Sequence, residues 1–547
     1  MKKCLIFVIL AMLLLASFCG VYAEDIVILY TNDVHCGYKD NLGYSSAAAL
    51  KDFYKTVTQN VLLVDNGDAI QGDAICAVSQ GEYIIDFMND VGYDYAILGN
   101  HEFDYGLDRL AELAEMADFP YIDANIVYTG TEVNKLGFLK PYAVHDFGTV
   151  KVGFVGADTP AALAESTPSF FQENGKFVYS FGKGENGSIL YRMVQEAVDA
   201  CKAEGADYVI LLAHLGIEEN AAPYRSVDVI ANTHDIDACL DAHSHSVIPS
   251  QYTANDRGEL IPLSSTGTKL NYIGVLTITD GGILTTTLVS GDLPKSAAFD
   301  EEAARVTADY EEQINKVVAC SSVDLRISDK NDIRMIRSRE TNLGDLVADS
   351  YRSETGADIA FVNGGGVRAD LDAGDLTYAD IMRCHPFGNS IVAIKASGQK
   401  ILDALEWGAR STQADYKDKA GSPVGENGQF LQVSGLRYTI DTSIESPAIS
   451  DDNSMFFGMI EDAPYRVSEV EVMKDGEWVP LDMEAEYILG GHDYMLLEHG
   501  GGFMMFDGCE LVLDSGIPDY QVLVNHILSF EDGLSVYAEP QGRITIK

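Results

Sequence analysis

Five short apolar runs in the first half of the chain each lead directly into aspartate, asparagine or histidine, and this repeated pattern constrains the fold most. The runs lie at residues 26–30, 61–64, 95–99, 208–213 and 238–242. Aliphatic runs without polar alternation are typical of strands that are buried on both faces. In sheets of such strands, ligands bind beyond the carboxyl ends. The pattern therefore predicts that five strand ends converge on one site.

The residues at these strand ends carry carboxylate, amide and imidazole groups. They are Asp33, His35, Asp68, Asn100, His101, His214, His243 and His245. The structural alternative is that each histidine only caps its strand through a hydrogen bond. That alternative needs several independent coincidences, because five of the seven histidines before residue 250 stand just past an apolar run. We therefore interpret the set as one site.

This donor set indicates divalent metal ions. Oxygen and imidazole ligands suit Zn²⁺, Mn²⁺ or Fe and are poor ligands for Cu(I). Leaving His101 aside, seven ligands exceed what one tetrahedral ion takes, whereas two ions that share a carboxylate would use them. Two metals ~3.5–4 Å apart can stabilise a phosphoryl displacement and lower the pKa of water toward ~7. The sequence therefore predicts a two-metal centre, with Zn²⁺ or Mn²⁺ favoured and Fe as an alternative.

The length of 547 residues predicts two large domains, because one hydrophobic core rarely grows so large. Residues 24–291 alternate strands with helices and are expected to form an α/β domain of two packed sheets flanked by helices. We expect its helices at residues 45–57, 83–91, 107–116 and 189–204. A charged helix at 299–319, within a linker of 292–320, would lead to a second α/β domain at 321–547.

The first 23 residues resemble a secretory signal peptide. Two lysines precede a fifteen-residue apolar core, and a small-x-small exit ends at Ala23. The core is shorter than the ~20 residues of a membrane span, although an uncleaved anchor remains the alternative. We expect cleavage after Ala23, export to a periplasm or the extracellular space, and no stable membrane insertion afterwards.

Cysteine usage and charge narrow the possible partners. The seven cysteines after residue 23 are distant from one another and odd in number, which predicts no disulfide framework. Cys36 adjoins His35, so it is either a soft ligand or, as we favour, a lone small residue. The net charge of −47 argues against nucleic-acid polymers as partners. A small anionic substrate remains compatible if local cations surround it.

The second domain offers such cations. A basic cluster comprises Arg326, Lys330, Arg334, Arg337 and Arg339, for which surface ion pairing is the alternative explanation. Apolar spacing predicts a helix that stops at Gly356, and a strand at 359–362 then leads into Asn363-Gly-Gly-Gly-Val-Arg368. Three glycines would let the backbone approach a ligand, and Arg368 could fork onto a phosphate. A plain glycine turn is the alternative.

Several motifs together resemble a known family. Asp33-x-His35, Gly67-Asp68, Gly99-Asn100-His101-Glu102, His214 and His243-x-His245 are similar to the metal motifs of calcineurin-like metallophosphoesterases. Residues 340–344, 363–368 and 386–388 resemble the branch of bacterial exported 5′-nucleotidases, which includes UDP-sugar hydrolases and ecto-5′-nucleotidases. The resemblance implies a calcineurin-like two-sheet sandwich and a separate α/β substrate-binding domain, joined by a helix.

The resemblance also implies a role for each site residue. One ion would be held by Asp33, His35, Asp68 and His245, and the other by Asp68, Asn100, His214 and His243, with Asp68 bridging. His101, oriented by Asp104, would donate to the phosphoryl oxygen, and Glu102 would be structural. Arg337, Asn363 and Arg368 would contact the phosphate and ribose of the substrate. Phe387 and Phe503 would sandwich its base, and Asp507 would accept a hydrogen bond from a ribose hydroxyl. Arg334 and Arg339 compete with Arg337 for its role.

These features predict an exported dimetal 5′-nucleotidase that releases phosphate from nucleoside 5′-monophosphates, with nucleotide pyrophosphates and UDP-sugars as further candidate substrates. One alternative is a 2′,3′-cyclic-nucleotide 2′-phosphodiesterase/3′-nucleotidase. The other, of a different class, is a nonenzymatic nucleotide-binding surface protein. The resemblance further implies hinge closure near the linker helix. The sequence does not predict the oligomeric state.

Overall fold

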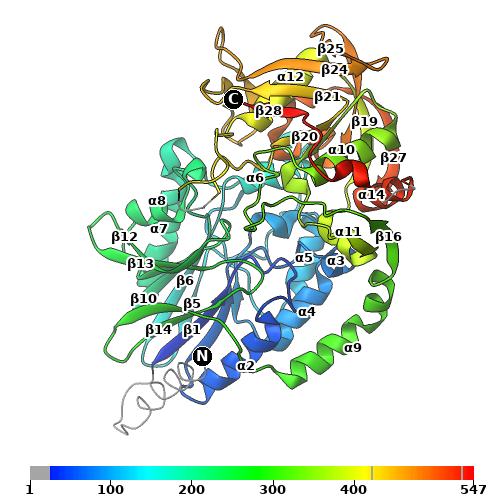
Figure 1. The fold of residues 1–547 in the computed structure, drawn as a ribbon. Helices are drawn as coiled ribbons and strands as arrows, with labels where there is room; N and C mark the ends of the chain where they lie inside the picture. The colour runs from blue at the N-terminus through cyan, green and yellow to red at the C-terminus, as the bar shows by residue number, and fades with distance from the viewer. Residues whose placement is uncertain (1–24, 420–422, 531–533) are drawn as a thin grey trace.

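The first domain is a sandwich of two sheets in the computed structural model, which describes residues 25–419, 423–530 and 534–547 (Figure 1). The expected signal peptide lies outside these residues. One sheet contains, in spatial order, β15 Leu284–Val289, β14 Ile273–Ile278, β1 Ile26–Thr31, β2 Val61–Asp65 and β3 Tyr95–Ala96. The other contains β12 Val247–Ala254, β13 Leu260–Thr266, β11 Ala238–Leu240, β10 Tyr208–His214, β6 Lys151–Asp158 and β5 Tyr142–Asp146.

The direction of the strands explains where the polar residues gather. β1, β2 and β3 are parallel neighbours, and so are β6, β10 and β11. Along β1, Ile28 and Tyr30 pack between the two sheets, whereas Val27 and Leu29 pack under the helices. Both faces of the strand are therefore apolar, which explains the absence of polar alternation. The carboxyl ends of these strands meet at one edge of the sandwich.

Helices cover the outer faces of both sheets. The first sheet is covered by α2 Gly43–Lys55, α3 Ala74–Ser79, α4 Glu82–Val91 and α5 Leu107–Met116, and the second by α7 Ser188–Ala203 and α8 Ser226–Ala231. The four expected helices are present, with bounds shifted by at most two residues. Among the helices that the structure describes, none combines the length and apolar character that a bilayer crossing requires.

The connection to the second domain differs from the expected helix at 299–319. The helix α9 spans Ala297–Ile314, and residues after it form the strand β16 Val317–Ser321, paired with β18 Gly374–Thr377. The consecutive valines at 317 and 318 suit a strand better than a helix. Phe299 and Tyr310 of α9 pack into the first domain's core. Ala379 and Met382 of the helix α11 Tyr378–Cys384 belong to the same cluster, so α9 contacts both domains.

The second domain is built on two further sheets. One contains β20 Leu431–Ser434, β17 Ile359–Asn363, β26 Glu486–His492, β19 Ser390–Ser397 and β27 Glu510–Pro518. The other contains β25 Glu477–Pro480, β24 Val467–Lys474, β21 Leu436–Ile440 and β28 Ile544–Ile546. Its longer helices are α10 Asn342–Thr355, α12 Gly398–Ala409 and α14 Asp519–Leu528, besides α11 Tyr378–Cys384 and α13 Asp493–Leu496.

The ends of α10 follow from its sequence. The hydroxyl of Thr341 accepts a hydrogen bond from the backbone N–H of Gly344, which caps the first turn. Gly356 adopts φ +62° after the last turn, a conformation that glycine tolerates best. This confirms the expected stop, and the chain then enters β17, whose carboxyl end carries Asn363.

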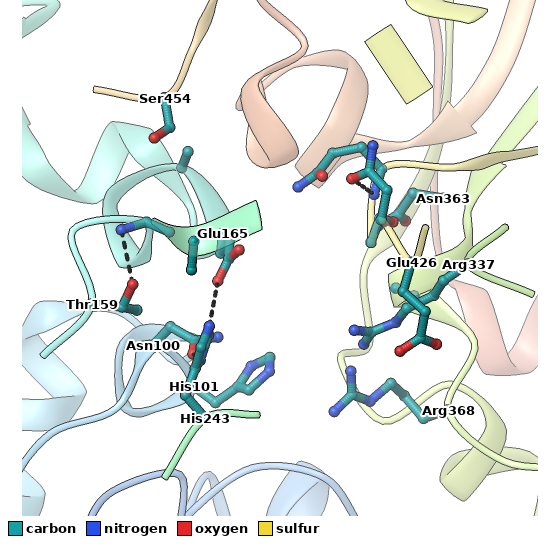
Figure 2. A pocket seen from close by; sticks show the side chains of 18 of the residues that line it. Asn100, His101, Thr159, Glu165, His243, Arg337, Asn363, Arg368, Glu426 and Ser454 are labelled. Atoms are coloured by element: carbon teal, nitrogen blue, oxygen red, sulfur yellow. Dashed lines mark hydrogen bonds and ion pairs between the residues drawn. The ribbon is translucent and has the colours of Figure 1, made fainter. Parts of the chain in front are cut away.

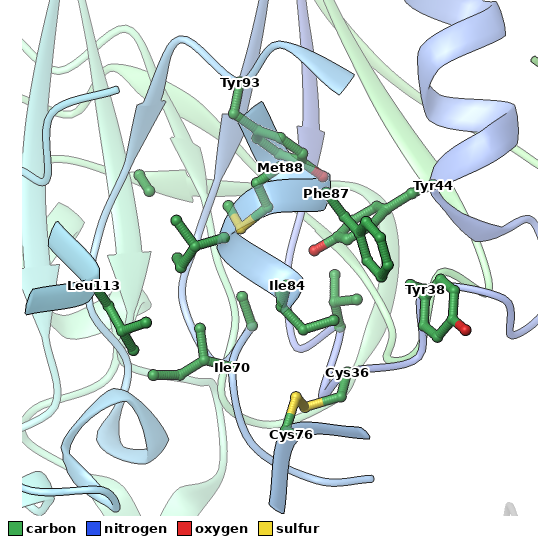
Figure 3. Packing of buried hydrophobic residues seen from close by; sticks show 14 of the residues in the cluster. Cys36, Tyr38, Tyr44, Ile70, Cys76, Ile84, Phe87, Met88, Tyr93 and Leu113 are labelled. Atoms are coloured by element: carbon green, nitrogen blue, oxygen red, sulfur yellow. A yellow bond between two sulfur atoms is a disulfide. The ribbon is translucent and has the colours of Figure 1, made fainter. Parts of the chain in front are cut away.

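The cysteine prediction is wrong for one pair. Cys36 and Cys76 form a buried disulfide in the core of the first domain (Figure 3). They are 40 residues apart in sequence, but they follow neighbouring parallel strands, so the loop after β1 and the helix α3 after β2 meet. Among the described residues, the remaining cysteines, at 201, 239, 320, 384 and 509, are free thiols. Spacing along the chain could not indicate this pair, because sheet topology sets the proximity.

Candidate active site

The predicted metal ligands meet at the carboxyl edge of the sandwich. Ligand atoms of Asp33, His35 and His245 lie within 4.8 Å of one another, and so do those of Asp33, Asp68 and His214. The remaining two expected ligands adjoin them: His243 Nδ1 is 3.0 Å from Asn100 Oδ1, and its ring is 5.1 Å from that of His214. All seven expected ligands are thus brought together.

The orientation of two imidazoles suits metal binding. His35 Nδ1 lies 2.9 Å from the Gln71 carbonyl, and His214 Nδ1 lies 2.8 Å from the Asn66 carbonyl. Each carbonyl anchors the ring through one nitrogen and points the other toward the cluster. His214 Nε2 is buried 3.2 Å from Asp68 Oδ2, yet it has no partner of hydrogen-bonding geometry among the described residues. An unpartnered buried nitrogen facing carboxylates fits a metal ligand.

Backbone strain is concentrated in these same residues. Five of the expected ligands have φ between +46° and +71°, in the left-handed region: Asp33, His35, Asp68, His243 and His245. Such conformations cost roughly 1–3 kcal/mol each in non-glycine residues and persist where surrounding contacts impose them. Here the backbone N–H groups of Asp33 and His35 donate to the carbonyls of Gly67 and Asp68. The two ligand-bearing loops therefore hold each other in place.

Two residues of the Gly99-Asn-His-Glu102 motif shape the loop around Asp68. A Cβ atom on Gly99 would lie 2.4 Å from Asp68 Oδ1 and 2.6 Å from His214 Cε1, so only glycine fits there. The buried carboxylate of Glu102 accepts hydrogen bonds from the backbone N–H groups of Asp68, Ala69 and Gly99, each at 2.7 Å. Glu102 therefore positions the loop from behind, away from the cavity.

Burial makes the cluster costly without a cation. Desolvation raises the pKa of Asp33 to about 7, against the opposing charge of His214. Desolvation also lowers the pKa of His35 well below its usual range, which favours the neutral imidazole. At His214 the charges of Asp68 and Asp33 outweigh burial and raise the pKa, so without a metal this imidazole tends to hold a proton among the carboxylates. A divalent cation in the cluster would stabilise these buried carboxylates instead. The residues present therefore fit the implied ions.

His101 stands beside this cluster with its own carboxylate. Its Nδ1 lies 2.7 Å from Asp104 Oδ2, and its backbone N–H donates to Asp68 Oδ1. Burial acts to lower the pKa of His101, but the charges of Asp104 and Asp68 outweigh burial and raise it. The imidazole is thus oriented and biased toward its protonated form, as a donor to developing negative charge requires.

A cavity of about 350 Å³ lies between the two domains and includes the metal-ligand edge. Figure 2 shows His101, His243 and Glu165 on the wall from the first domain, facing Arg337, Asn363 and Arg368 on the wall from the second. Phe387 also lines the cavity, and its ring lies 5.8 Å from that of His101. Four expected substrate contacts therefore lie opposite the expected metal ligands.

The second-domain wall concentrates positive charge. Burial, together with the charges of Arg334 and Arg368, lowers the pKa of Arg337 to about 9, and its Nε is buried without a partner among the described residues. Arg334 also lines the cavity but pairs with Glu426 at 2.7 Å. Arg339 instead donates to backbone carbonyls and does not line it. Arg337 and Arg368 are thus best placed to receive an anion.

Two expected substrate contacts lie elsewhere in this structure. The Phe503 side chain is fully buried in the second domain's core, with its ring stacked on Phe506. The Asp507 side chain is 70% exposed and lies 3.9 Å from His499. Neither residue lines the cavity. A glycine-rich turn, Gly500–Gly502, precedes Phe503.

Sequence reasoning missed several residues that line the cavity. They are Thr159, Glu165, Glu218, Arg410, Gln429 and Tyr494, among others. Thr159 follows the end of β6, a strand parallel to β10, so the argument from strand ends could have found it. The others are single polar residues or aromatics without a local pattern, and only the folded chain brings them to the cavity.

Comparison with known proteins agrees with this architecture. The family model described as calcineurin-like phosphoesterase matches residues 26–247, and the model described as 5′-nucleotidase, C-terminal domain, matches residues 317–508. Among solved structures, a 5′-nucleotidase precursor from Thermus thermophilus is similar, with a TM-score of 0.77 and 25% identity over 95% of this chain and 99% of that chain.

Curated relatives come from more than one branch. A 5′-nucleotidase of Vibrio parahaemolyticus is 26% identical over 76% of this chain and 78% of its own length. A 2′,3′-cyclic-nucleotide 2′-phosphodiesterase/3′-nucleotidase of Haemophilus influenzae is 26% identical over 92% of this chain and 84% of its own. The trifunctional nucleotide phosphoesterase YfkN of Bacillus subtilis is 24% identical over 95% of this chain, which spans only 35% of that protein.

Proposed function

Because this chain belongs to the 5′-nucleotidase family of calcineurin-like phosphoesterases, we propose that it releases phosphate from nucleoside 5′-monophosphates. The observation that carries the proposal is the cavity between the domains. Its first-domain wall presents a buried cluster of carboxylates and imidazoles, and its second-domain wall presents Arg337 and Arg368. A phosphate between these walls would meet cations on both sides.

The proposed roles follow the geometry. Asp33, His35, Asp68, Asn100, His214, His243 and His245 would hold two divalent ions, with Zn²⁺ or Mn²⁺ favoured by their donor atoms. Such ions supply Lewis-acid polarisation of the phosphoryl group and ready ionisation of water at neutral pH. Arg337 and Arg368 would orient the phosphate. Their positive charges would compensate its negative charge inside the cavity.

His101 would act on the developing charge. Its protonated imidazole, oriented by Asp104, donates to a phosphoryl oxygen as negative charge builds there. Asn363 would contact the ribose side, since its Oδ1 is held by His492 Nε2 at 2.8 Å and its side chain reaches the cavity. Phe387 would support the base from one side.

The organisation and location of the chain complete the proposal. We keep a signal peptide at 1–23, a metallophosphoesterase domain at 24–291, a linker at 292–320 and a substrate-binding domain at 321–547. Export to a periplasm or the extracellular space is supported by the Cys36–Cys76 disulfide, because disulfides persist in oxidising compartments. The expected partner is a small nucleotide, not a nucleic-acid polymer.

Phosphate release from AMP by the purified mature protein tests the proposal. We expect turnover with Mn²⁺ or Zn²⁺, loss after chelation, and recovery when metal is restored. Retained nucleotide binding without phosphate release under any metal condition would support the nonenzymatic alternative and contradict an enzyme.

A second candidate is the hydrolysis of 2′,3′-cyclic nucleotides, favoured by the similarity to the Haemophilus influenzae protein over 92% of this chain. Both activities would use the same metal cluster. Comparing kcat/KM for 2′,3′-cAMP and AMP distinguishes them, and a large preference for the cyclic ester would replace the first proposal.

A further inference from the structure

Arg410 is a half-buried cation on the cavity wall to which the proposed hydrolysis gives no role. It follows α12, and its guanidinium lies over the ring of Trp407, 3.7 Å from the centroid. Its Nη1 donates to the Trp407 carbonyl and its Nη2 to Gln429 Oε1, at 2.6 and 3.1 Å. The guanidinium plane is therefore fixed by stacking and by two hydrogen bonds.

The guanidinium is fixed but not neutralised. Among the described residues, no carboxylate forms an ion pair with Arg410, whereas neighbouring Arg334 is paired with Glu426. Burial lowers the pKa of Arg410 to about 9, and only the more distant charge of Glu165 opposes this. Arg410 lines the cavity, whereas Trp407 lies beneath it and is 2% exposed. The guanidinium thus presents its free donors toward the cavity.

The contacts of Arg410 link it to the part of the second-domain wall that carries Asn363. Gln429 follows Gly428, whose carbonyl accepts a hydrogen bond from Asn363 Nδ2 at 3.2 Å. In Figure 2, Asn363 lies above Arg337 and Arg368 on the same wall. Trp407 Nε1 also donates to the carbonyl of Gly501, in the glycine-rich turn before Phe503. Arg410 therefore stands where a nucleotide anchored by its phosphate would extend its base.

Of the two phenylalanines expected to sandwich the base, one lines the cavity, together with Tyr494. Phe387 lines the cavity, but Phe503 is buried in the core. A planar guanidinium backed by an indole is held in a fixed plane, in which its free N–H groups can meet the edge of a base. Of its five N–H donors, two are used internally, so others remain for the edge of a base.

We propose that Arg410 is a base-recognition residue that selects 6-oxopurine nucleotides, those of guanine or hypoxanthine. Adjacent N–H groups of a guanidinium match the O6 and N7 acceptors of these bases, whereas adenine presents an amino donor in place of O6. The inference rests on the proposed nucleotidase activity and names its preferred substrates.

The test compares substrates that share the phosphate and differ in the base. We expect wild-type kcat/KM to be higher for GMP and IMP than for AMP. In Arg410→Gln, the ratio of kcat/KM for GMP to that for ribose 5-phosphate, which has no base, should fall roughly 10- to 100-fold, chiefly through KM. Arg437→Gln is the matched control, because Arg437 also stacks on a tryptophan, Trp478, outside the cavity.

Each other outcome has a distinct meaning. An equal loss for GMP and ribose 5-phosphate, at an unchanged unfolding temperature, overturns base recognition. If the wild type hydrolyses none of these compounds, the proposed nucleotidase function fails instead. In that case the inference is tested by binding: the affinities of the metal-loaded wild type and of Arg410→Gln for GMP and AMP are measured at equilibrium. If the two proteins bind GMP with equal affinity, the inference is overturned.

Discussion

At the scale of single residues, His101 and Asp104 form a pair whose geometry serves proton donation more than metal binding. The carboxylate holds Nδ1 and raises the pKa of the ring. By contrast, Nδ1 of His35 and of His214 is anchored by a backbone carbonyl, so that Nε2 of each ring faces the cluster. Burial lowers the pKa of His35, whereas the charges of Asp68 and Asp33 outweigh burial at His214 and raise its pKa. The partner of Nδ1 thus distinguishes the two roles: a carboxylate holds the proposed proton donor His101, whereas backbone carbonyls hold the proposed metal ligands His35 and His214.

Replacing His101 should therefore affect turnover without removing the ions. We expect His101→Ala to lower kcat for AMP by roughly 10²–10⁴-fold, the range for one general acid–base group. Titration calorimetry with Mn²⁺ should give an affinity close to that of the wild type. His145→Ala is a control, because His145 contacts Tyr95 in the same domain outside the cavity.

Asp104 should matter only through His101. Asp104→Asn is expected to lower kcat less than His101→Ala, and the double variant should be no slower than His101→Ala alone. Fully additive losses, or wild-type activity in His101→Ala, would contradict this division of roles.

At the scale of elements, the loops after β1 and β2 carry three of the proposed metal ligands, and all three have left-handed backbone conformations. Left-handed residues in both loops are held by hydrogen bonds between them, and the Cys36–Cys76 disulfide ties the first loop to α3. Cys36 directly follows His35 in sequence, so the covalent link lies beside a proposed metal ligand. A disulfide restricts the unfolded chain and can hold strained loops in register.

Removing this link should weaken both folding and metal binding. The chain-entropy estimate for a loop of this length is on the order of 4 kcal/mol. We expect Cys36→Ser with Cys76→Ser to lower the unfolding temperature and the Mn²⁺ affinity of the oxidised protein. Cys320→Ser, at an exposed free thiol, is the matched control. A double variant with unchanged Mn²⁺ affinity would show that the loops keep their conformation without the link.

At the scale of the whole molecule, the cavity exists because the two domains touch. Arg383 of α11 pairs with Asp73 before α3 at 3.1 Å, and the hydroxyl of Tyr494 donates to the carbonyl of Glu165 at 2.7 Å. The proposed hinge closure would make and break such contacts. If the substrate must contact both walls, its apparent affinity depends on the fraction of molecules in the closed conformation.

Weakening one of these contacts should raise KM modestly. Arg383 is partly exposed, so its ion pair contributes only about 0.2–1 kcal/mol. Arg383→Gln should accordingly raise KM for AMP up to about fivefold with little change in metal affinity. Arg305→Gln, at an exposed pair within α9, serves as the control. An unchanged KM would argue that this contact does not bias closure.

Metal removal should destabilise the molecule as a whole. Ions that bind the folded chain alone add about 2.7 kcal/mol at one hundred times their dissociation constant. Calorimetry of the mature protein should therefore show a lower unfolding temperature after chelation, restored by Mn²⁺ or Zn²⁺. The same scan on Asp68→Asn should show a much smaller response, because Asp68 lies in the ligand cluster.

Much of the first domain could be predicted because its signals are local. Apolar runs such as 208–213 indicated buried strands, the segments between the runs were correctly expected to contain α5 and α7, and polar residues after the strands indicated the site edge. The extent of α9 was misjudged, since the valines that begin β16 pair with a strand some 60 residues later in the chain. The composition of residues 299–319 alone does not indicate that a distant strand pairs with its end.

The amino-acid sequence alone was sufficient to indicate the fold class and to nominate the metal ligands, because strand order along the chain and residue type at each strand end are local properties. Only the folded chain decided which distant side chains face one another. The pairing of Cys36 with Cys76, the burial of Phe503 and the exposure of Arg410 to the cavity all depend on contacts between segments far apart in sequence. Packing of whole elements sets those contacts, and no single segment encodes them.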